Sequence, residues 1–324
     1  MGTNASSPAG NRSLLLSSMR EFESLLEPLL GRLAPRSLCE IGVGDGRFME
    51  FLIGYARANG CLYTAIDPAI AEAVAGRHAD ERIRFVKSRS LEALPNLPSH
   101  DLYFIDGDHN YYTVRQELNW IVRRSASRPL ILLHDVGWPW GRRDQYCDSG
   151  SIPPADCHPN STSLGVRPGR NELGDGGFSG RQSDYTYAAA MHEGGPRNGV
   201  LTAVEDFLAE DGRKAGWQFV VVPMLFGLGV LYHPEACPPE MTAFIRRLEE
   251  GLAIFQGLMA RVESNRVDLF LAFLDGSQRF TDLHGEYDAL RAAYAKLDTH
   301  CHGLQDEYEK LMDAYKGLQQ QSAR

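Results

Sequence analysis

The chain has 324 residues and is 43% hydrophobic, which is enough for a main domain with a sizeable core and a further segment. Its formal net charge of -9 argues against a general nucleic-acid surface, because phosphate binding requires clustered Lys and Arg. The six cysteines form no Cys-x-x-Cys pair, which favours a reduced cytoplasmic protein over a disulfide framework. We expect neither a signal peptide nor a membrane span, since no apolar run approaches about 20 residues.

The first part of the chain alternates helical and strand patterns. Residues 1–12 are small and polar, which predicts a disordered tail, and residues 14–33 have helical spacing. Residues 37–46 predict a strand that ends in a glycine-rich turn, and residues 48–55 continue as a helix. This order is the beginning of an α/β domain.

The glycine-rich turn carries the first sign of a ligand site. It contains Glu40, Gly42, Gly44 and Gly46, each separated by one residue. A dinucleotide-binding loop requires a third glycine where this chain has Arg47, so an NAD dehydrogenase is disfavoured. Glycines at this spacing make a tight turn and allow a ligand to approach the backbone closely.

Two further strands are predicted at residues 62–67 and 83–86. The first ends in Asp67, and an isolated acid at this place is usually a helix cap. Because the glycine-rich turn lies upstream, we favour a role for Asp67 in accepting hydrogen bonds from ribose hydroxyls. The second strand leads into a turn that contains Arg89 and Ser90.

The most informative stretch runs from Asp101 to Asp135. Two apolar segments of strand length flank a helical pattern over residues 111–124, which is the unit of a parallel sheet. Ligands bind at the carboxyl ends of such strands. We therefore expect one edge to gather the following side chains: Asp106, Asp108, His109, His134 and Asp135.

Three interpretations of this edge are open. Asp106 and Asp135 could cap helices, with His109 at the beginning of the next helix and His134 buried. Asp106 and Asp135 could instead bind a divalent ion of the Mg²⁺ kind, with His134 pointing to a softer ion such as Mn²⁺. His109 could act as a general base, because imidazole titrates near neutral pH. The last two interpretations combine naturally.

Residues 136–197 form a long insertion rich in Gly, Pro, Asn, Asp and Ser, with almost no apolar periodicity. A loop of this length is unusual unless it is functional or disordered, and its aromatic residues argue against disorder. We interpret it as a substrate lid or wall. Aromatic side chains together with Arg142 and Arg143 would suit a ring-shaped polar acceptor such as a sugar.

After the insertion we expect a helix at residues 199–208 and an antiparallel pair of strands at residues 217–222 and 225–232. From Pro238 the chain turns helical. From Phe273 to Leu318 it carries an apolar heptad repeat, with Phe, Tyr or Cys at position a and Leu, except for one Gly, at position d.

Heptads sustained in this way predict a coiled coil and a homo-oligomer rather than a helix packed on the domain. The segment Glu286-Tyr287-x-x-Leu290-x-x-Ala293-Tyr294 recurs 21 residues later. The bulky residues at position a favour three or more strands. An antiparallel arrangement or a different protein as partner stays open at this point.

The Glu-x-Gly-x-Gly-x-Gly loop, followed by Asp67, resembles the cofactor loop of class I S-adenosylmethionine-dependent methyltransferases. The resemblance covers about residues 30–234. It implies a Rossmann-like, mostly parallel α/β sheet with an antiparallel last strand, and S-adenosylmethionine as cofactor. The cofactor-binding residues that it implies are Glu40, Gly42, Gly44, Gly46, Asp67, Ser90 and Asp106.

Asp106-Gly107-Asp108-His109, followed by His134-Asp135, is similar to the metal-dependent O-methyltransferases that modify macrolide sugars. That similarity implies Asp106 and Asp135 as ligands of Mg²⁺ or Mn²⁺ and His109 as catalytic base. His134 stands where that family has an acid, and we expect it to be the third ligand. The implied reaction is O-methylation of a sugar or glycan hydroxyl.

Two other functions stay open. One is a cephalosporin-hydroxylase-like reaction on the same scaffold, and the other is a non-catalytic cofactor-binding protein that acts through its coiled coil. We expect a methyltransferase domain at residues 13–236, a helical connector at 237–272 and a coiled coil at 273–324.

Overall fold

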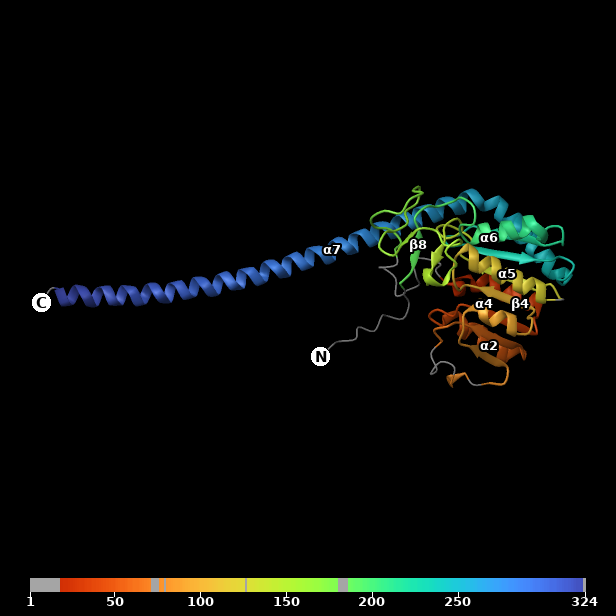
Figure 1. Cartoon of the computed structure of the whole chain (residues 1–324), viewed down its shortest axis with the longest axis horizontal. Coiled ribbons are helices and arrows are strands. Elements are labelled where there is room, and N and C mark those ends of the chain that lie inside the picture. The colour runs from red at the N-terminus through yellow and green to blue at the C-terminus, as the bar shows by residue number, and fades with distance from the viewer. Residues whose placement is uncertain (1–17, 71–75, 79, 126, 180–185, 323–324) are drawn as a thin grey trace. The chain divides into compact units, whose positions relative to one another are not determined.

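The computed structural model describes residues 18–322 except 71–75, 79, 126 and 180–185 (Figure 1). The tail that the sequence predicts to be disordered, residues 1–12, lies outside the described residues. The chain divides into two compact units, Met1–Phe270 and Leu271–Arg324.

A seven-stranded sheet organises the first unit. Its strand order is β3-β2-β1-β4-β5-β10-β9. The first five strands in this order are parallel to one another, and β10 is antiparallel to both of its neighbours. The predicted Rossmann-like α/β fold is therefore confirmed. The strands are β1 (Ser37–Ile41), β2 (Leu62–Ile66), β3 (Ile83–Val86), β4 (Leu102–Ile105), β5 (Leu130–His134), β9 (Gln218–Val222) and β10 (Leu228–Tyr232).

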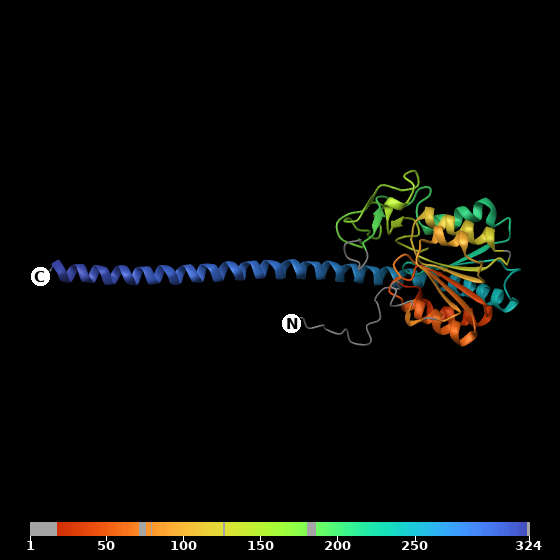
Figure 2. The ribbon, with the colours of Figure 1, turned by 60° about the horizontal axis from the view of Figure 1, so that its bottom comes forward.

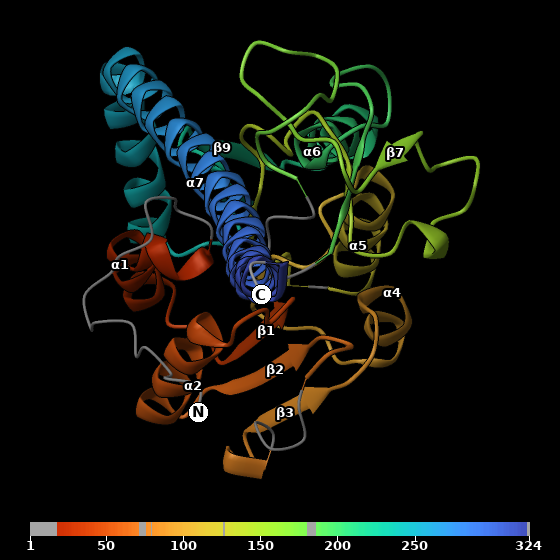
Figure 3. The same cartoon turned by 90° about the vertical axis from the view of Figure 1, so that its left-hand side faces the viewer.

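Helices cover both faces of the sheet (Figures 2 and 3). One face packs against α1, α2 and the beginning of α7, and the other packs against α4, α5 and α6. The helices are α1 (Glu23–Leu33), α2 (Arg47–Asn59), α4 (Ser90–Ala93), α5 (Tyr111–Arg124), α6 (Val200–Phe207) and α7 (Pro239–Ser322), with the short turns η1 (Met19–Phe22), η2 (Leu94–Asn96), η3 (Ser149–Ser151) and the π-helical η4 (Leu208–Gly212).

The alternation of side chains along the central strands explains how the site is arranged. In β4, Leu102 and Phe104 enter the core beneath α1 and α2, whereas Tyr103 and Ile105 enter the core beneath α5. The side chains of β5 alternate in the same way over residues 130–133. Because strand side chains alternate with a period of two, residues 106 and 134 leave their strands toward the same face.

The insertion at residues 136–197 is more regular than its sequence suggests. It contains a three-stranded antiparallel sheet in the order β6-β8-β7, formed by β6 (Gln145–Tyr146), β7 (Asn160–Ser161) and β8 (Ala188–Ala190). These strands are very short and pair across long stretches of chain, so they leave no local periodicity that sequence reasoning could detect.

Helix α7 is continuous over 84 residues and crosses the boundary between the two units. Its apolar heptad side chains in the second unit are exposed, for example Leu290 and Tyr294 at 70% each. Among the described residues, no helix combines the length and the apolar character that a membrane span requires.

One buried acid stands out in the α5 layer. Glu117 is fully buried, and burial raises its pKa to about 8, while the nearby Ser90 hydroxyl lowers it and Asp108 raises it further. The folded pKa lies above the ordinary value of 4.5, so the folded state favours the protonated form. Stability from this group is complete below pH 4.5 and is lost as pH rises through about 8.

We predict that Glu117→Gln, which keeps the shape of the protonated acid, will flatten the fall in the free energy of unfolding between pH 5 and 8. The expected gain near pH 8 is on the order of a few kcal/mol. Denaturant unfolding across this pH range measures it, with the exposed Glu172→Gln as control. Part of the slope should remain, because burial raises the pKa of Glu40 to about 8 as well. An unchanged slope in Glu117→Gln would contradict the assignment.

Candidate active site

The glycine-rich loop joins the ends of three neighbouring strands. Gly42 has φ +87°, and a Cβ atom built there would lie 2.2 Å from the carbonyl oxygen of Asp106. The Asp106 amide donates to the Ile41 carbonyl at 2.8 Å, and the Gly42 amide donates to the Ile66 carbonyl at 2.9 Å. Only glycine fits this contact, because a side chain would displace the end of β4. The predicted cofactor loop is thus also a support for Asp106.

The other two predicted glycines shape the turn without such crowding. Gly44 and Gly46 have φ +53° and +80°, and Gly46 directly precedes α2. A Cβ atom at Gly44 would meet no described atom within 4 Å. Their positive φ angles make the tight strand-to-helix turn and leave its amide groups near the carboxyl edge of the sheet.

The two predicted acids beside the loop lie in different environments. Glu40 is 1% exposed and accepts a hydrogen bond from the Tyr63 hydroxyl of β2. Asp67 is half-buried, and it accepts from the Val43 amide at 2.8 Å and from the Ala69 amide at 2.6 Å. A carboxylate has about four acceptor positions, so Asp67 retains capacity for ligand hydroxyls. Glu40 is enclosed, and its hydrogen bond with Tyr63 links β1 to β2.

Ser90, the remaining predicted cofactor residue, is the first residue of α4 and is half-buried. Its hydroxyl lies near Glu117 of α5. The preceding Arg89 forms an ion pair with Asp148 of the insertion at 2.6 Å. The turn after β3 is therefore in direct contact with the insertion.

Asp106, His134 and Asp135 come together at the ends of β4 and β5. Each offers a ligand atom, and these atoms lie within 4.8 Å of one another. His134 Nδ1 lies 2.7 Å from Asp135 Oδ2 and 3.2 Å from Asp106 Oδ1. Two carboxylates and an imidazole are a donor set that Mg²⁺ or Mn²⁺ accepts, so the side chains fit the metal that the sequence predicts.

The histidine of this group is buried. Burial alone would lower the pKa of His134, but the carboxylates of Asp106 and Asp135 raise it well above its ordinary value. The ring of Phe22 meets His134 edge-on at 5.9 Å between centroids, and Phe226 stacks on it at 6.0 Å. These rings keep water from the imidazole and restrict its orientation.

His109 lies beside the same carboxylate. Its Nδ1 is 3.1 Å from Asp135 Oδ2, and its side chain is 16% exposed. Within the described part of the chain, its Nε2 atom has no hydrogen-bond partner. A histidine whose Nδ1 is held by a carboxylate can take up a proton at Nε2, which is the arrangement of a general base.

Asp108 lies at the same edge, where its charge interacts with His109, but it is not one of the three metal-ligand candidates. It accepts hydrogen bonds from the Cys147 amide at 3.0 Å and the Thr113 hydroxyl at 3.3 Å. Burial raises its pKa. Asp108 therefore anchors the insertion to the beginning of α5, and the metal-ligand candidates among the described residues are Asp106, His134 and Asp135.

The two neighbouring arginines of the insertion, Arg142 and Arg143, both have partners in the folded chain. Arg142 forms two hydrogen bonds with Glu205, at 2.5 and 2.7 Å. Arg143 is fully buried and donates to the carbonyl groups of Ala190 and Asn171. Arg142 therefore joins the insertion to α6, and Arg143 holds distant parts of the insertion together.

Most of its aromatic residues are buried too: Trp140 is 4% exposed, Tyr146 0%, Phe178 9% and Tyr187 8%. Tyr185 lies outside the described residues. Trp138, three residues after Asp135, is half-buried, and its ring meets Phe178 edge-on at 5.6 Å between centroids. Trp138 is thus the remaining aromatic candidate for a contact with the acceptor.

Sequence reasoning missed the support that α7 gives to the site. The carboxylate of Glu263 accepts a hydrogen bond from the Leu225 amide at 2.8 Å, next to the ring that stacks on His134. Phe270 stacks on Phe178 at 5.5 Å, and Phe178 in turn meets Phe226. No local sequence pattern predicts these contacts, because Leu225 and Glu263 are 38 residues apart.

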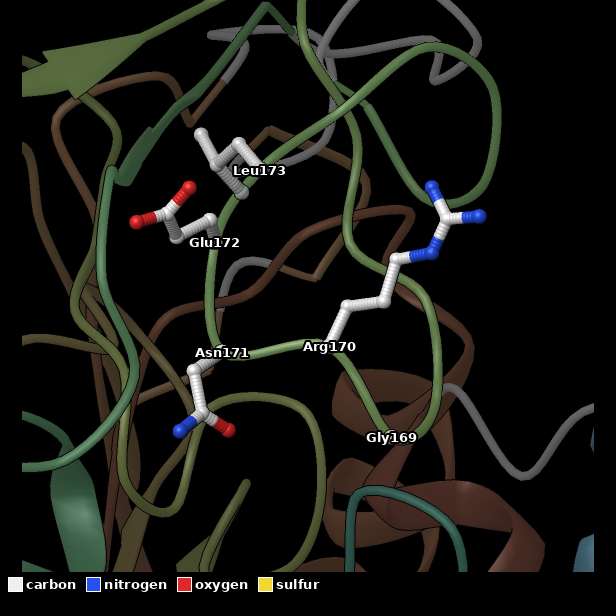
Figure 4. A pocket seen from close by; sticks show the side chains of 5 residues that line it. All are labelled: Gly169, Arg170, Asn171, Glu172 and Leu173. Atoms are coloured by element: carbon white, nitrogen blue, oxygen red, sulfur yellow. The ribbon is translucent and has the colours of Figure 1, made fainter.

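Two open hollows lie elsewhere on the chain. One of about 560 Å³ is lined by five consecutive residues of the insertion, 169–173, whose side chains diverge (Figure 4). Another of about 270 Å³ lies between α5 and the insertion and is lined in part by Arg115 and Arg197. Arg115 pairs with Glu210 and Arg197 pairs with Asp156, so both arginines of the second hollow are paired.

Residues 39–136 match the family model of a methyltransferase domain. A search of curated proteins finds no match. Several solved structures are similar to the chain. A methyltransferase from Podospora anserina bound to S-adenosylhomocysteine is 16% identical, with 67% of this chain and 80% of that chain covered and a TM-score of 0.41.

An O-methyltransferase from Bacillus cereus, also bound to S-adenosylhomocysteine, is 13% identical over 67% of this chain and 81% of that chain, with a TM-score of 0.39. MycE, a methyltransferase of the mycinamycin biosynthetic pathway bound to Mg and S-adenosylhomocysteine, is 15% identical over 36% of this chain and 34% of that chain, with a TM-score of 0.30. The family match covers the cofactor loop, Asp67 and the strand ends of the site. Residues 39–136 therefore form a methyltransferase domain, in agreement with the S-adenosylmethionine-dependent methyltransferase that the sequence predicts.

Proposed function

We propose that this methyltransferase is a divalent-metal-dependent O-methyltransferase that acts on a hydroxyl of a sugar or glycan. The observation that carries the proposal is the shared carboxylate oxygen of Asp135, which lies 2.7 Å from His134 Nδ1 and 3.1 Å from His109 Nδ1. A metal-ligand group and a base therefore adjoin at the edge where the cofactor loop ends.

Asp106, His134 and Asp135 would hold the metal. A divalent ion in that position lowers the pKa of a hydroxyl that it binds. The role of His109 follows from its contact with Asp135. The carboxylate fixes the ring through Nδ1, and Nε2 takes the proton that the acceptor hydroxyl loses as it is methylated. The bound cofactor supplies the methyl group.

A sugar acceptor is supported by the similarity of Asp106-Gly107-Asp108-His109 and His134-Asp135 to sugar-modifying enzymes. Trp138 adds a physical reason, because a half-buried indole beside the site can stack on the apolar face of a sugar ring. Incubation of candidate glycans with enzyme, S-adenosylmethionine and Mg²⁺ or Mn²⁺, followed by mass spectrometry, tests the acceptor class. A mass gain of one methyl group on a glycan hydroxyl is the expected result.

Self-association through residues 273–324 is part of the same proposal. The apolar heptad positions of this segment are exposed in the single chain, and water-exposed apolar stripes of this length are covered by partner helices. Removal of residues 273–324 should leave a methyltransferase domain of lower oligomeric state that retains cofactor binding.

The first prediction concerns the cofactor. Asp67→Ala should weaken S-adenosylmethionine binding by roughly 1–3 kcal/mol, because the ribose hydroxyls lose a charged acceptor. Calorimetry without added metal measures the affinity. Asp45→Ala is the matched control, since Asp45 lies in the same loop and, among the described residues, bonds only to Arg47. Equal affinities of the two variants would contradict the role of Asp67.

The second prediction concerns the chemistry. His109→Ala should lower turnover by about 10²–10⁴-fold, the usual contribution of a general base, while the affinity for the cofactor stays unchanged. His192→Ala, an exposed histidine of the insertion, should have no effect. Full activity of the wild-type enzyme in excess chelator would rule out the metal requirement, whatever the His109 variant does.

The third prediction concerns Glu263. Glu263→Ala should weaken Mn²⁺ binding by up to about 10-fold, because the Leu225 amide loses its acceptor and the ring stacked on His134 loses its support. Glu263→Gln retains an acceptor oxygen and should restore most of the affinity. The exposed Glu250→Ala on the same helix is the control. If all three variants bind Mn²⁺ like the wild type, α7 does not support the site.

A further inference from the structure

We propose that the coiled coil pairs residues 273–318 of identical chains in a parallel, in-register arrangement. This inference rests on the self-association proposed above and adds the identity of the partner, its direction and its register. Four observations carry it: the pattern of exposure, the internal repeat, the charges beside the seam and the length of the overlap.

The exposed apolar side chains of α7 beyond residue 272 form one stripe along the helix. Beyond residue 272, all large hydrophobic side chains that are more than one-third exposed lie at heptad positions a and d, with the exception of Met312. Their exposed fractions run from 52% to 73%. A helix exposed to solvent all round would not confine its large apolar residues to one stripe. The stripe comprises Phe273, Phe280, Leu283, Tyr287, Leu290, Tyr294, Leu297, Leu304, Tyr308, Leu311, Tyr315 and Leu318.

The stripe matches a copy of itself. Position a is Phe or Tyr in every heptad except at Cys301, and position d is Leu in every heptad except at Gly276. In a parallel in-register bundle each layer contains one kind of residue, so aromatic layers alternate with leucine layers. Pairing of a with d, as in an antiparallel bundle, would instead place an aromatic ring beside leucine in every layer except those of Cys301 and Gly276.

The charges that flank the seam favour the parallel direction. In a parallel pair, position g of one helix faces position e of the next heptad, so Glu286 faces the partner's Arg291. In an antiparallel pair with the same overlap, Glu286 faces the partner's Glu307, and a repulsive contact accompanies the attraction of Arg291 to the partner's Asp298. The parallel pair therefore has the attraction of Glu286 to the partner's Arg291 and lacks the repulsion between Glu286 and the partner's Glu307.

The register follows from the length of the overlap. The 21-residue repeat allows a second alignment, in which the two helices are shifted by three heptads. That shift would leave three heptads of apolar side chains uncovered on each helix. The in-register alignment covers all seven a positions and all seven d positions, so it buries more apolar surface than the shifted alignment. It also places Cys301, at position a, opposite the partner's Cys301.

Cys301 makes the arrangement testable in the full-length protein, because its thiol is free and exposed in the single chain. Mild oxidation with copper-phenanthroline should link Cys301 to the partner's Cys301. A covalent dimer on a non-reducing gel is the expected result, and Cys301→Ser should abolish it. Light scattering of the same samples before oxidation should give a multiple of 36.0 kDa for both proteins.

A second pair of variants tests the seam itself. Leu290→Asp, at position d, should reduce the mass toward one chain, whereas Ala292→Asp, at the outward position f, should leave it unchanged. A mass of 36.0 kDa for the wild type at micromolar concentration overturns the self-association. An oligomer that forms no Cys301 crosslink overturns the parallel, in-register arrangement alone. Neither result affects the methyl transfer, which is measured separately.

Discussion

The carboxylate of Asp135 is the contact on which the candidate site depends. Its backbone has φ +62°, a conformation that costs energy for a residue with a side chain, and it is 3% exposed. Burial alone would raise the pKa of Asp135, but His109 and His134 hold it below its ordinary value. A strained, buried and charged residue persists only where its surroundings hold it, and here the two histidines do so. One carboxylate thus fixes a metal-ligand candidate and a base at once.

The neighbouring strands hold this arrangement from both sides. On one side, Gly42 allows the end of β1 to lie against the backbone of Asp106, so the cofactor loop packs directly on a member of the metal-ligand group. On the other side, Phe226 stacks on His134 and exchanges backbone hydrogen bonds with Gly137 and Trp138. The insertion therefore begins in direct contact with the rings that enclose the histidine. A substitution at Gly42, at Phe226 or at the beginning of the insertion should therefore alter the arrangement of Asp106, His134 and Asp135.

The sequence predicts the elements that depend on short-range pattern. The strands and the helix between β4 and β5 follow from apolar runs in the sequence. Polar residues such as Asp67 and Asp106 mark where the strands end. The insertion does not follow in this way. The β6 and β8 strands pair residues 145 and 189, and Arg143 is buried against carbonyl groups far along the chain. The Glu263 contact with Leu225 is equally distant. Such contacts are set by the folded arrangement, and no local signal marks them.

Binding of Mn²⁺ to the purified chain tests the central claim most directly. Electron paramagnetic resonance of free Mn²⁺ should show saturable binding of a single ion per chain. Asp106→Asn and Asp135→Asn should each abolish it, while the exposed Asp148→Asn should bind like the wild type. If the wild type binds no Mn²⁺, or if the Asp106 and Asp135 variants bind it as well as the wild type, the metal site described here does not exist.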